Sequence, residues 1–403
     1  MRIFFICHRV PYPPDRGDKI ATFNMLRHLS SKHEVHVFCL STAPSDDTSV
    51  SALECYAQQV TAVRVSGFAK RVRAVAALYS GRPISVVLAN EPRLHEAVAT
   101  AARNSPPDLI LVYSSDMAQF AVNLGAAPRF MYFSDLDSQK WRLYGEKRGF
   151  PLNWIYRREG RLLADYERQI AHSFSHSFVC TEAEKRDFEK LIPGVPVSVS
   201  SNGVDLEYFS SMRVIKKRGT LIFTGVMNYF PNIDAVSWFC KEIFPRIKQQ
   251  IPFATFVICG KDPAPAVKRL ADHEGVIVTG AVPDVRPYLD AAEISVVPLR
   301  IARGIQNKLL EGLAMGLPCI SSRCSWEGTN IDQGAGVLVA DDADQFVEHA
   351  IHLLQDEKYR TLQGQLARVS VEEKHTWASQ LRLLDEMIGR AACARELPAL
   401  TAP

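Results

Sequence analysis

Several features that define whole classes of protein are missing from this chain. No run of about 18 apolar residues is present to span a bilayer, and the first apolar run, in MRIFFICHRV, is too short for a secretory signal. The net charge is only +3, whereas a protein that binds duplex nucleic acid needs a strong basic excess. We therefore expect a cytoplasmic protein with no nucleic-acid partner.

Motifs for metal chemistry and for nicotinamide binding are also missing. The nine cysteines are scattered, with no pair at the spacing of metal ligands, and the eleven histidines include no HExxH. No G-x-G-x-x-G follows any apolar run, which argues against a nicotinamide dehydrogenase. Cysteines at the ends of apolar runs, as in FFIC and FVICG, are typical of small buried side chains in a reducing compartment.

The chain does have a regular alternation of short apolar runs with longer helical patterns. Its 403 residues exceed the size of one ordinary core, so two α/β domains are expected. Strand, helix, strand in this order predicts parallel, doubly wound sheets, with the first helix over 19–29. The predicted strands cover 2–7, 35–40, 60–65, 109–113, 130–133, 177–180 and 197–200, and then 220–225, 255–260, 276–279, 294–299, 319–321 and 337–340.

The alternation is interrupted once, by a polar and basic segment that contains SSMRVIKKRG. We interpret residues 206–218 as a linker between an N-terminal domain over 1–205 and a C-terminal domain over 219–375. The last helical stretch has no strand after it, so residues 376–403 are predicted to form a helix that crosses back to the N-terminal domain, followed by a tail. Both domains should bind ligands at the carboxyl ends of their strands.

The segment RGIQNKLLEGLAMGLPCISS, residues 303–322, carries the strongest local signal for ligand binding. Gly304 permits a tight turn, and a helix over about 305–314 would present unpaired N–H groups to a diphosphate. Lys308 adds a positive charge in the first turn. Glu311 lies three residues later on the same face, where its carboxylate could accept hydrogen bonds from ribose hydroxyls. A solvated helix pair explains Lys308 and Glu311 equally well when they are taken alone.

The continuation of that segment resembles a known signature. E-x-x-A-x-G-x-P followed by a strand, here from Glu311 to Pro318, is similar to the donor site of the family 4 retaining glycosyltransferases. SNGVDLEYF, FTGVMNYFPNIDAVSWF and the N-terminal FICHRVPYPPDRGDKIATFNMLRHLS resemble other elements of that family. VPYPPDRGDK, YFSDLDSQKW and GIQNKLLEGLAMG resemble the subfamily linked to bacterial exopolysaccharide and exosortase (PEP-CTERM) systems. The resemblance implies an α/β protein of the GT-B fold, with two Rossmann-like parallel-sheet domains facing a central cleft.

The resemblance also implies where the donor, a nucleotide diphosphate sugar, is held. Many family members carry two glutamates in this region; Glu311 matches the second, whereas the first position is occupied by Arg303. Arg303 could pair with a phosphate or with an anionic donor sugar. No metal or other cofactor is implied. The residues expected to bind the donor on the C-terminal domain are Gly225, Arg303, Gly304, Ile305, Gln306, Lys308 and Glu311.

Two segments of the N-terminal domain are candidates for the acceptor side. In PPDRGDK, Gly17 would let the backbone approach a phosphate or a reacting sugar, although a plain βα loop fits the same residues. In YFSDLDSQKW, Asp135 and Asp137 follow a strand and point in opposite directions if the chain is extended, so at most one need face the cleft. We assign Asp135 to orienting the acceptor or stabilising the reacting centre.

A third segment of the N-terminal domain bears on membrane attachment. WRLYGEKRGFPLNWIYRREGRLL, residues 141–163, combines aromatic and cationic side chains, which suits the headgroup region of an anionic membrane. An ordinary helix with snorkelling arginines has the same composition. Peripheral attachment to the inner face of the plasma membrane and a purely structural role are therefore both compatible with this segment.

Together these expectations describe a retaining glycosyltransferase of exopolysaccharide biosynthesis that transfers a sugar to a glycan or lipid-linked acceptor. Asp135, Lys308 and Glu311 would be its catalytic residues, acting chiefly by electrostatic stabilisation as the diphosphate leaves. Because Arg303 replaces a glutamate, a non-catalytic sugar-nucleotide-binding subunit of a polysaccharide assembly complex is an alternative. A sugar-nucleotide epimerase on the same fold is another.

Overall fold

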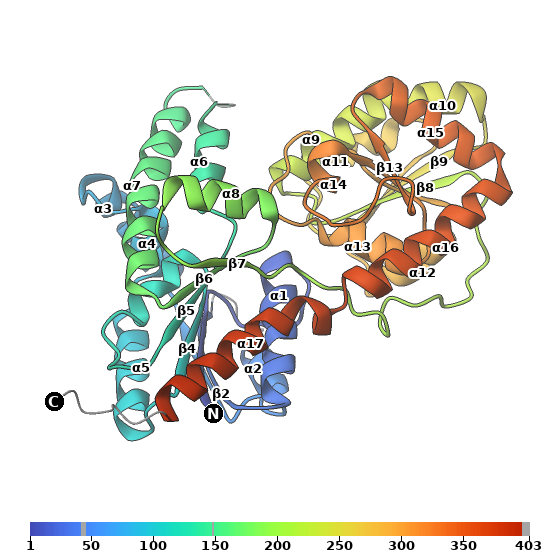
Figure 1. Ribbon diagram of the computed structural model, residues 1–403. Helices are drawn as coiled ribbons and strands as arrows, with labels where there is room; N and C mark the ends of the chain where they lie inside the picture. Colours follow the sequence, from blue (N-terminus) through green and yellow to red (C-terminus); the bar gives the residue numbers. More distant parts are fainter. Residues whose placement is uncertain (42–45, 147–148, 397–403) are drawn as a thin grey trace. The chain divides into compact units, whose positions relative to one another are not determined.

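The computed structural model describes residues 1–41, 46–146 and 149–396, and the chain divides into two compact units. The first unit comprises Met1–Ser201 and the chain from Leu381 onward, and the second comprises Asn202–Gln380. The helix α17 (Trp377–Glu396) therefore begins in the second unit and continues in the first. Each unit is built around one parallel β-sheet (Figure 1).

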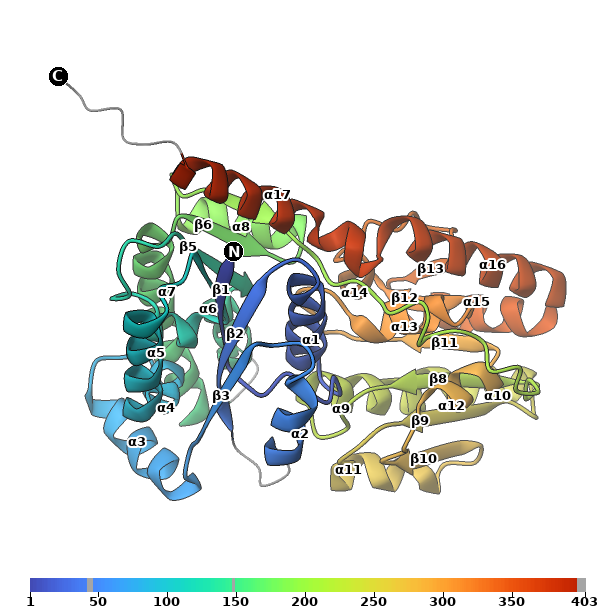
Figure 2. The same ribbon diagram turned by 90° about the horizontal axis from the view of Figure 1, so that it is seen from below.

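The sheet of the first unit has seven parallel strands in the order β3-β2-β1-β4-β5-β6-β7. Its central strands are buried except at their ends, and the run LILVY is buried throughout, because helices cover both faces of a parallel sheet. In Figures 1 and 2, α1 lies on one face of this sheet and α5 on the other. The strands are β1 (Arg2–Cys7), β2 (Glu34–Ser41), β3 (Gln59–Arg64), β4 (Leu109–Tyr113), β5 (Arg129–Ser134), β6 (His176–Val179) and β7 (Val197–Val199).

The helices of the first unit include two whose ends are capped by buried glutamates. Glu159 accepts hydrogen bonds from the backbone of Ile84 (2.6 Å) and Ser85 (2.9 Å), and Glu167 accepts one from the backbone of Ser138 (3.1 Å). These carboxylates therefore hold α4 and α6 against α7. The helices are α1 (Gly17–Ser30), α2 (Asp46–Leu53), α3 (Gly67–Tyr79), α4 (Ile84–Ala89), α5 (Pro92–Asn104), η1 (Ser115–Phe120), α6 (Asp137–Glu146), α7 (Leu152–Ser173) and α8 (Glu182–Leu191).

The sheet of the second unit has six parallel strands in the order β10-β9-β8-β11-β12-β13. They are β8 (Thr220–Thr224), β9 (Thr255–Cys259), β10 (Val276–Gly280), β11 (Ile294–Val297), β12 (Cys319–Ser322) and β13 (Val337–Ala340). The helices are α9 (Phe230–Trp238), η2 (Phe239–Ile243), α10 (Phe244–Gln250), α11 (Pro265–Lys268), η3 (Arg269–Asp272), α12 (Arg286–Ala291), α13 (Asn307–Ala314), α14 (Arg323–Trp326), α15 (Ala343–Gln355) and α16 (Glu357–Lys374).

Each strand order reverses at one point, and this point fixes where ligands are expected. In the first unit the chain runs from β1 outward to β3 and then returns to β4 on the other side of β1. In the second unit it runs from β8 to β10 and returns to β11 beside β8. Ligands of doubly wound sheets bind beyond the carboxyl ends of the strands at such a switch point. The β1/β4 and β8/β11 edges are therefore the places to look for function.

Three local details differ from the sequence-based expectations. The helix expected from about Ile305 begins at Asn307, because Gln306 has an extended backbone and occupies the cap position. The backbone is not extended between Asp135 and Asp137, since β5 ends at Ser134 and α6 begins at Asp137. A separate helix, α16, precedes the final one.

Within the described ranges, no helix combines the length and the hydropathy that a bilayer-spanning segment needs.

The polar segment 206–218 contains no helix or strand and is held by buried acids of the second unit. Asp290, only 3% exposed, accepts hydrogen bonds from the backbone of Met212 (2.8 Å) and Val214 (3.0 Å). Glu293 accepts one from the backbone of Gly219 (2.7 Å). Side-chain carboxylates thus take the place of the strand partners that this backbone lacks.

Candidate functional site

The predicted donor-binding residues of the second unit lie around its switch point. Gly225 directly follows β8, and residues 298–306 lead from β11 to α13. Gly304 has a positive φ of 62°, which turns the chain toward the start of that helix. A Cβ atom at Gly328 would lie 2.6 Å from the carbonyl oxygen of Gly304, so the turn is packed closely against its neighbour. The turn before α13 therefore packs closely against Gly328.

Lys308 is the second residue of α13 and is half-buried. Its Nζ donates a hydrogen bond to Oδ1 of Asn232 (3.1 Å) and lies 5.2 Å from the centre of the Phe223 ring. Burial lowers the pKa of Lys308 to about 8, although the nearby Glu311 carboxylate partly opposes this effect. Lys308 is thus a cation with little water around it, at the amino end of a helix, where an anion is favoured.

Glu311 lies one helical turn after Lys308 and is also half-buried. Burial raises the pKa of Glu311 to about 7, and the Lys308 ammonium partly opposes the rise. No hydrogen bond joins the two side chains, so the carboxylate keeps its capacity to accept hydrogen bonds from a ligand. A nucleoside diphosphate fits this pair. It needs a cation for its phosphates and, about one helical turn away, a hydrogen-bond acceptor for its ribose.

Asn232, which the sequence analysis did not identify, sets the position of Lys308. Its side chain is 3% exposed, and Nδ2 donates to the carbonyl of Val226 (2.9 Å), which leaves Oδ1 for the lysine. A Cβ atom at Gly225 would lie 2.8 Å from Asn232 Nδ2 and 3.3 Å from Lys308 Cε. The glycine at the end of β8 is therefore required by the close packing of these two side chains.

The remaining predicted donor residues line the approach to α13. Arg303, Gly304, Ile305 and Gln306 are all half-buried. Gln306 Nε2 donates to the carbonyl of Arg303 (3.1 Å), which closes the turn, and Ile305 packs against the core of the unit. Asn202, from the predicted SNGVD element, donates to Oδ1 of Asn307 (2.9 Å) at the first position of the helix. The helix start is thus fixed from both sides.

In the first unit, Gly17 and Asp135 also lie at the carboxyl edge of the sheet. Gly17 is the exposed first residue of α1, in the loop that follows β1. Asp135 is half-buried in the turn after β5, directly after Ser134, whose φ is +66°. Asp137 forms an ion pair with Lys140 within α6. Asp135 therefore lies in the turn before α6, and Asp137 in the first turn of that helix.

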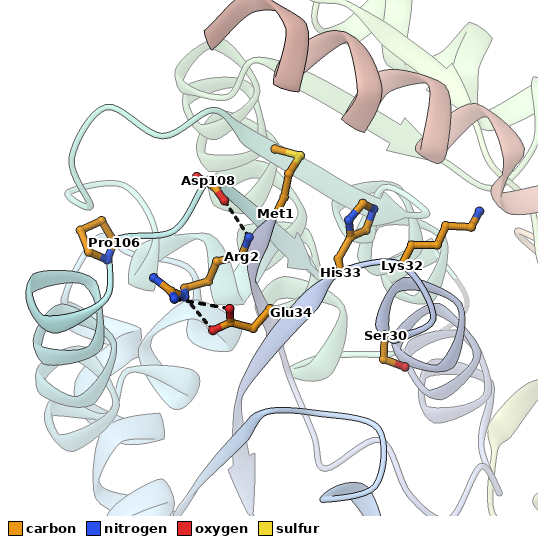
Figure 3. Close-up of a pocket in the computed structure, with 8 residues that line it drawn as sticks. All are labelled: Met1, Arg2, Ser30, Lys32, His33, Glu34, Pro106 and Asp108. Atoms are coloured by element: carbon orange, nitrogen blue, oxygen red, sulfur yellow. Dashed lines mark hydrogen bonds and ion pairs between the residues drawn. The ribbon is translucent and has the colours of Figure 1, made fainter. Parts of the chain in front are cut away.

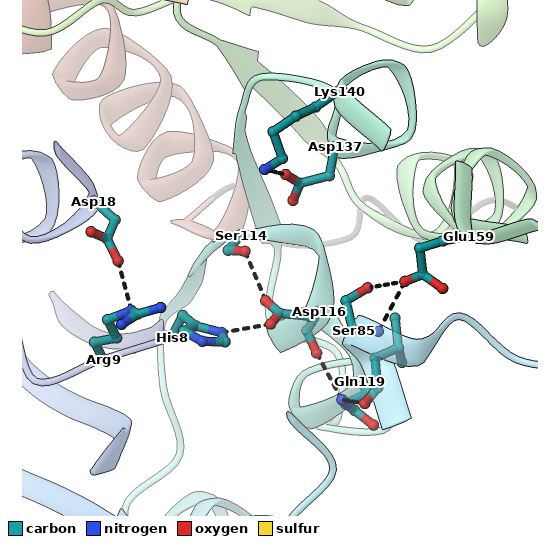
Figure 4. A network of polar contacts seen from close by, with 11 residues as sticks. His8, Arg9, Asp18, Ser85, Ser114, Asp116, Gln119, Asp137, Lys140 and Glu159 are labelled. Carbon is teal, nitrogen blue, oxygen red and sulfur yellow. Dashed lines mark hydrogen bonds and ion pairs between the residues drawn. The ribbon is translucent and has the colours of Figure 1, made fainter. Parts of the chain in front are cut away.

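A polar network at the β1/β4 switch point was missed by the sequence analysis (Figure 4). Nδ1 of His8, just after β1, lies 2.5 Å from Oδ2 of Asp116, just after β4. Arg9 pairs with Asp18 at 2.9 Å in the same network. His8 and Asp116 are far apart in the sequence, so the only available signal was that each follows a buried strand by a few residues.

The pocket drawn in Figure 3 lies at the opposite edge of the same sheet. It is formed around the amino ends of β1 and β2, where Arg2 pairs with Glu34 (2.8 Å) and its backbone N–H donates to Asp108 (2.7 Å). Ligands of parallel sheets bind at the carboxyl ends. We therefore place the candidate site at the switch points and not in this pocket. In the described part of the chain, no three His, Cys, Asp or Glu side chains are grouped to hold a metal ion.

Comparison with known proteins places these features in context. Residues 218–356 match the family model described as glycosyl transferases group 1. No curated protein sequence matches the chain. Among solved structures, sucrose-phosphate synthase from Thermosynechococcus elongatus is similar, with a TM-score of 0.72 and 13% identity over 98% of this chain and 100% of that one.

Two further solved structures are similar over nearly the whole chain. HepE from Anabaena, solved in complex with UDP, has a TM-score of 0.68 and 12% identity, over 97% of this chain and 100% of its own. WaaG, a glycosyltransferase involved in lipopolysaccharide biosynthesis, has a TM-score of 0.65 and 14% identity, over 96% and 100%. The predicted fold class is confirmed. The chain has the GT-B fold, and its second unit contains a region similar to the glycosyl transferases group 1 family.

Proposed function

We propose that the protein is a retaining, family 4 glycosyltransferase that moves a sugar from a nucleotide diphosphate sugar to a glycan or lipid-linked acceptor. The observation that carries the proposal is the Lys308–Glu311 pair at the β8/β11 switch point. It lies within the region that matches the glycosyl transferases group 1 model. HepE, a structural neighbour, binds UDP and UDP-glucose. UDP is therefore the first nucleotide to test here.

The chemistry follows from the charges around α13. As the glycosidic bond to the donor breaks, negative charge develops on the leaving diphosphate. The Lys308 ammonium and the unpaired N–H groups at the start of α13 would stabilise that charge without the cost of reorganising water. Glu311 would hold the ribose hydroxyls, so that the diphosphate lies over the helix terminus. Asp135 of the first unit would orient the acceptor. No step requires a metal ion or another cofactor.

Retention and a role in exopolysaccharide synthesis are the finer parts of this proposal. They are supported by the E-x-x-A-x-G-x-P run that starts at Glu311 and by the resemblance of the first loop to the exopolysaccharide-linked subfamily. Retention is tested by proton NMR of the reaction product, since the anomeric coupling constant distinguishes the two configurations. A product of inverted configuration would remove the family 4 assignment and leave the donor site in place.

Calorimetric titration with UDP, GDP and ADP tests the donor site. We expect one nucleotide to bind, and Glu311→Ala to weaken that binding by about 10- to 100-fold. This is the loss expected when a charged hydrogen-bond partner of the ribose is removed. Glu348→Ala changes an exposed glutamate of the same unit and serves as the matched control. Equal affinity in the unaltered chain and in Glu311→Ala would contradict the assignment of Glu311.

Turnover separates an enzyme from a binding subunit. Nucleotide release is measured with UDP-glucose, UDP-galactose, UDP-N-acetylglucosamine, GDP-mannose and ADP-glucose, each with octyl β-glucoside or water as the acceptor. We expect turnover that depends on the added acceptor. Binding without turnover would support the non-catalytic subunit that Arg303 suggests. Conversion of the donor sugar without nucleotide release would indicate an epimerase.

The lipid-linked acceptor gives a reason for a membrane-binding surface, which we place at the start of α7. Phe150 (85% exposed), Leu152 (43%) and Trp154 (55%) project from this end of the first unit. Arg157 and Arg161 are exposed on the same helix face as Trp154, one and two turns further along. The apolar side chains come first along this surface and the arginines follow. This order matches a membrane, in which the acyl chains lie beneath the anionic headgroups. Lys147 and Arg148, also part of the predicted segment, lie outside the described residues.

Vesicle sedimentation tests this surface. Binding to vesicles containing phosphatidylglycerol is expected to fall about 10- to 100-fold in the double variant Phe150→Ala, Trp154→Ala, because two exposed apolar side chains no longer leave water. Ile215→Ala, which removes an 88%-exposed side chain of the second unit, is the control. Binding to neutral phosphatidylcholine vesicles should be weak throughout. If the double variant sediments like the unaltered chain, the surface lies elsewhere or is absent.

A further inference from the structure

Three aromatic side chains form a cluster on the helices α6 and α7 of the first unit. The ring centres of Trp141 and Tyr144, both on α6, are 6.1 Å apart. The ring of Tyr156, on α7, lies 5.2 Å from that of Trp141 and 6.4 Å from that of Tyr144. All three side chains are only half-buried. Partly exposed aromatic rings that gather on one surface mark a binding site.

The rings lie beside the contact between the two helices and are not needed to fill it. The helices α6 and α7 lie side by side in the first unit (Figure 1) and touch at two glycines. A Cβ atom at Gly160 would lie 3.0 Å from the carbonyl oxygen of Ser138, and one at Gly145 would lie 3.1 Å from Cγ of Arg157. Helices that approach this closely leave no space for an aromatic ring between their backbones.

The faces of the rings remain available to a ligand. The planes of the three ring pairs meet at 84°, 45° and 59°, so no pair is stacked face to face. Nε1 of Trp141 and the hydroxyl of Tyr156 make no hydrogen bond within the described ranges. The cluster therefore combines apolar ring faces with polar groups that can still bind a ligand.

A carboxylate lies one helical turn before Trp141, on the same side of α6. Asp137 is the first residue of the helix, and its side chain is 27% exposed. Its Oδ1 forms an ion pair with Lys140 (Figure 4). Its Oδ2 has no hydrogen bond or ion pair to any residue that the structure describes. Oδ2 can therefore accept hydrogen bonds from a ligand.

Aromatic ring faces beside a carboxylate match the chemistry of a sugar ring. A pyranose such as β-glucose has faces that carry C–H bonds, which pack on an aromatic ring, and a rim of hydroxyls that need hydrogen-bond partners. An acyl chain would also cover the rings, but it would take water from the carboxylate without replacing the lost hydrogen bonds, which is unfavourable. The composition of this surface therefore favours a sugar over a lipid tail.

We propose that Trp141, Tyr144 and Tyr156, together with Asp137, bind a pyranose ring of the acceptor. This rests on the proposed glycosyl transfer, and it makes the acceptor a glycan or a glycosylated lipid. The helix α6 begins at Asp137, close to the carboxyl end of β5, and ends at Glu146, shortly before the membrane-binding surface at the start of α7. The lipid of a glycosylated acceptor would lie at that surface and its sugar on α6.

Saturation-transfer NMR with the methyl glycosides of glucose, galactose, mannose and N-acetylglucosamine tests binding without turnover. We expect at least one of them to bind, with more saturation on the protons of one sugar face than on those of the other. Trp141→Ala should weaken that binding by about tenfold, the loss expected for one stacked ring, and Trp141→Phe should retain most of it. Tyr79→Ala removes an 88%-exposed aromatic ring of the same unit and is the control. The proposal is overturned if none of the four glycosides binds, or if Trp141→Ala binds them normally.

Asp137 is tested with the glycoside that binds best. Asp137→Ala should weaken its binding by about tenfold, because the sugar hydroxyls lose a charged acceptor, whereas Asp137→Asn should weaken it less. Vesicle sedimentation should be normal in Trp141→Ala, and glycoside binding should be normal in the double variant Phe150→Ala, Trp154→Ala. Loss of both properties in each variant would mean that the hairpin is disrupted as a whole, and the separate sugar surface would be rejected.

Kinetics separate this proposal from the proposed function. With octyl β-glucoside as the acceptor, Trp141→Ala should raise KM for the acceptor by about tenfold and leave UDP affinity unchanged, since the ring contributes to acceptor binding alone. If the unaltered chain binds glycosides through Trp141 but turns over no donor, the glycosyl transfer fails and the sugar surface stands. If transfer occurs and Trp141→Ala has a normal KM for the acceptor, only the sugar surface fails.

Discussion

Replacing Lys308 with alanine is expected to reduce sugar transfer by about 10²- to 10³-fold, the range seen when one preorganised group that stabilises developing charge is removed. The ammonium is held by Asn232 at 3.1 Å and is half-buried, so little water is available to replace it. The affinity for the intact sugar nucleotide should fall less, by about 10- to 100-fold, since in the unreacted donor the oxygen that links the phosphate to the sugar carries less charge than in the transition state. Transfer rates and calorimetry on the same preparations measure both quantities.

The pH dependence of UDP binding provides a second test of the role of Lys308. Only the protonated form of Lys308 attracts the diphosphate, and burial lowers its pKa in the free protein to about 8. Affinity is therefore expected to decline as the pH rises through that value, because the ammonium is lost. Lys241→Ala removes an exposed lysine of the same unit and should change neither the affinity nor its pH dependence. A flat profile in the unaltered chain up to pH 10 would contradict the role of Lys308.

Gly260→Ala is expected to destabilise the second unit by about 3 kcal/mol, at the upper end of the cost of forcing extra atoms into a packed site. A Cβ atom at this position would lie 1.7 Å from the carbonyl oxygen of Gly225, which is backbone and cannot turn aside. The loops after β8 and β9 must then separate. For a unit of this size the change corresponds to a loss of roughly 6–12 °C in Tm.

The same substitution should weaken UDP binding, since Gly225 packs against Asn232 and Lys308. Thermal unfolding followed by circular dichroism measures stability, and calorimetry on the folded fraction measures affinity. Gly389→Ala is the control: a Cβ atom there meets nothing within 4 Å, and alanine in the middle of α17 should be neutral or slightly stabilising. Normal stability of Gly260→Ala would mean that the two loops do not pack as described.

The strands were predictable because their signal is local. Buried parallel strands are short apolar runs, and runs such as 109–113 and 337–340 coincide with β4 and β13. Helix ends were less predictable. Asn307 rather than Ile305 opens α13, because the preceding loop is held by Gly328 and Asn202, which no local pattern reveals. The helix α16 was missed, whereas the start expected for the final helix, residue 376, lies directly before Trp377, where α17 begins.

Within the candidate site, the spacing of residues along one helix predicted the pair formed by Lys308 and Glu311, but not the residues that hold this pair in place. Lys308 and Glu311 were identifiable because a helix places residues three apart on one face. Asn232 lies in an apolar stretch of another helix, and its contact with Lys308 exists only in the folded unit. His8 and Asp116 meet through the pairing of β1 with β4, so their contact follows from the strand order and not from the local sequence.

The path of α17 has a consequence for how the chain is made. The second unit is one continuous stretch, complete once Gln380 has been synthesised, whereas the first unit also needs the residues from Leu381 onward. Leu381, Leu384 and Ile388 are all buried, on one face of that last helix. On the ribosome, the half of the protein that begins first is therefore finished last. A premature stop near residue 380 would leave the second unit whole and the first unit with an uncovered apolar face.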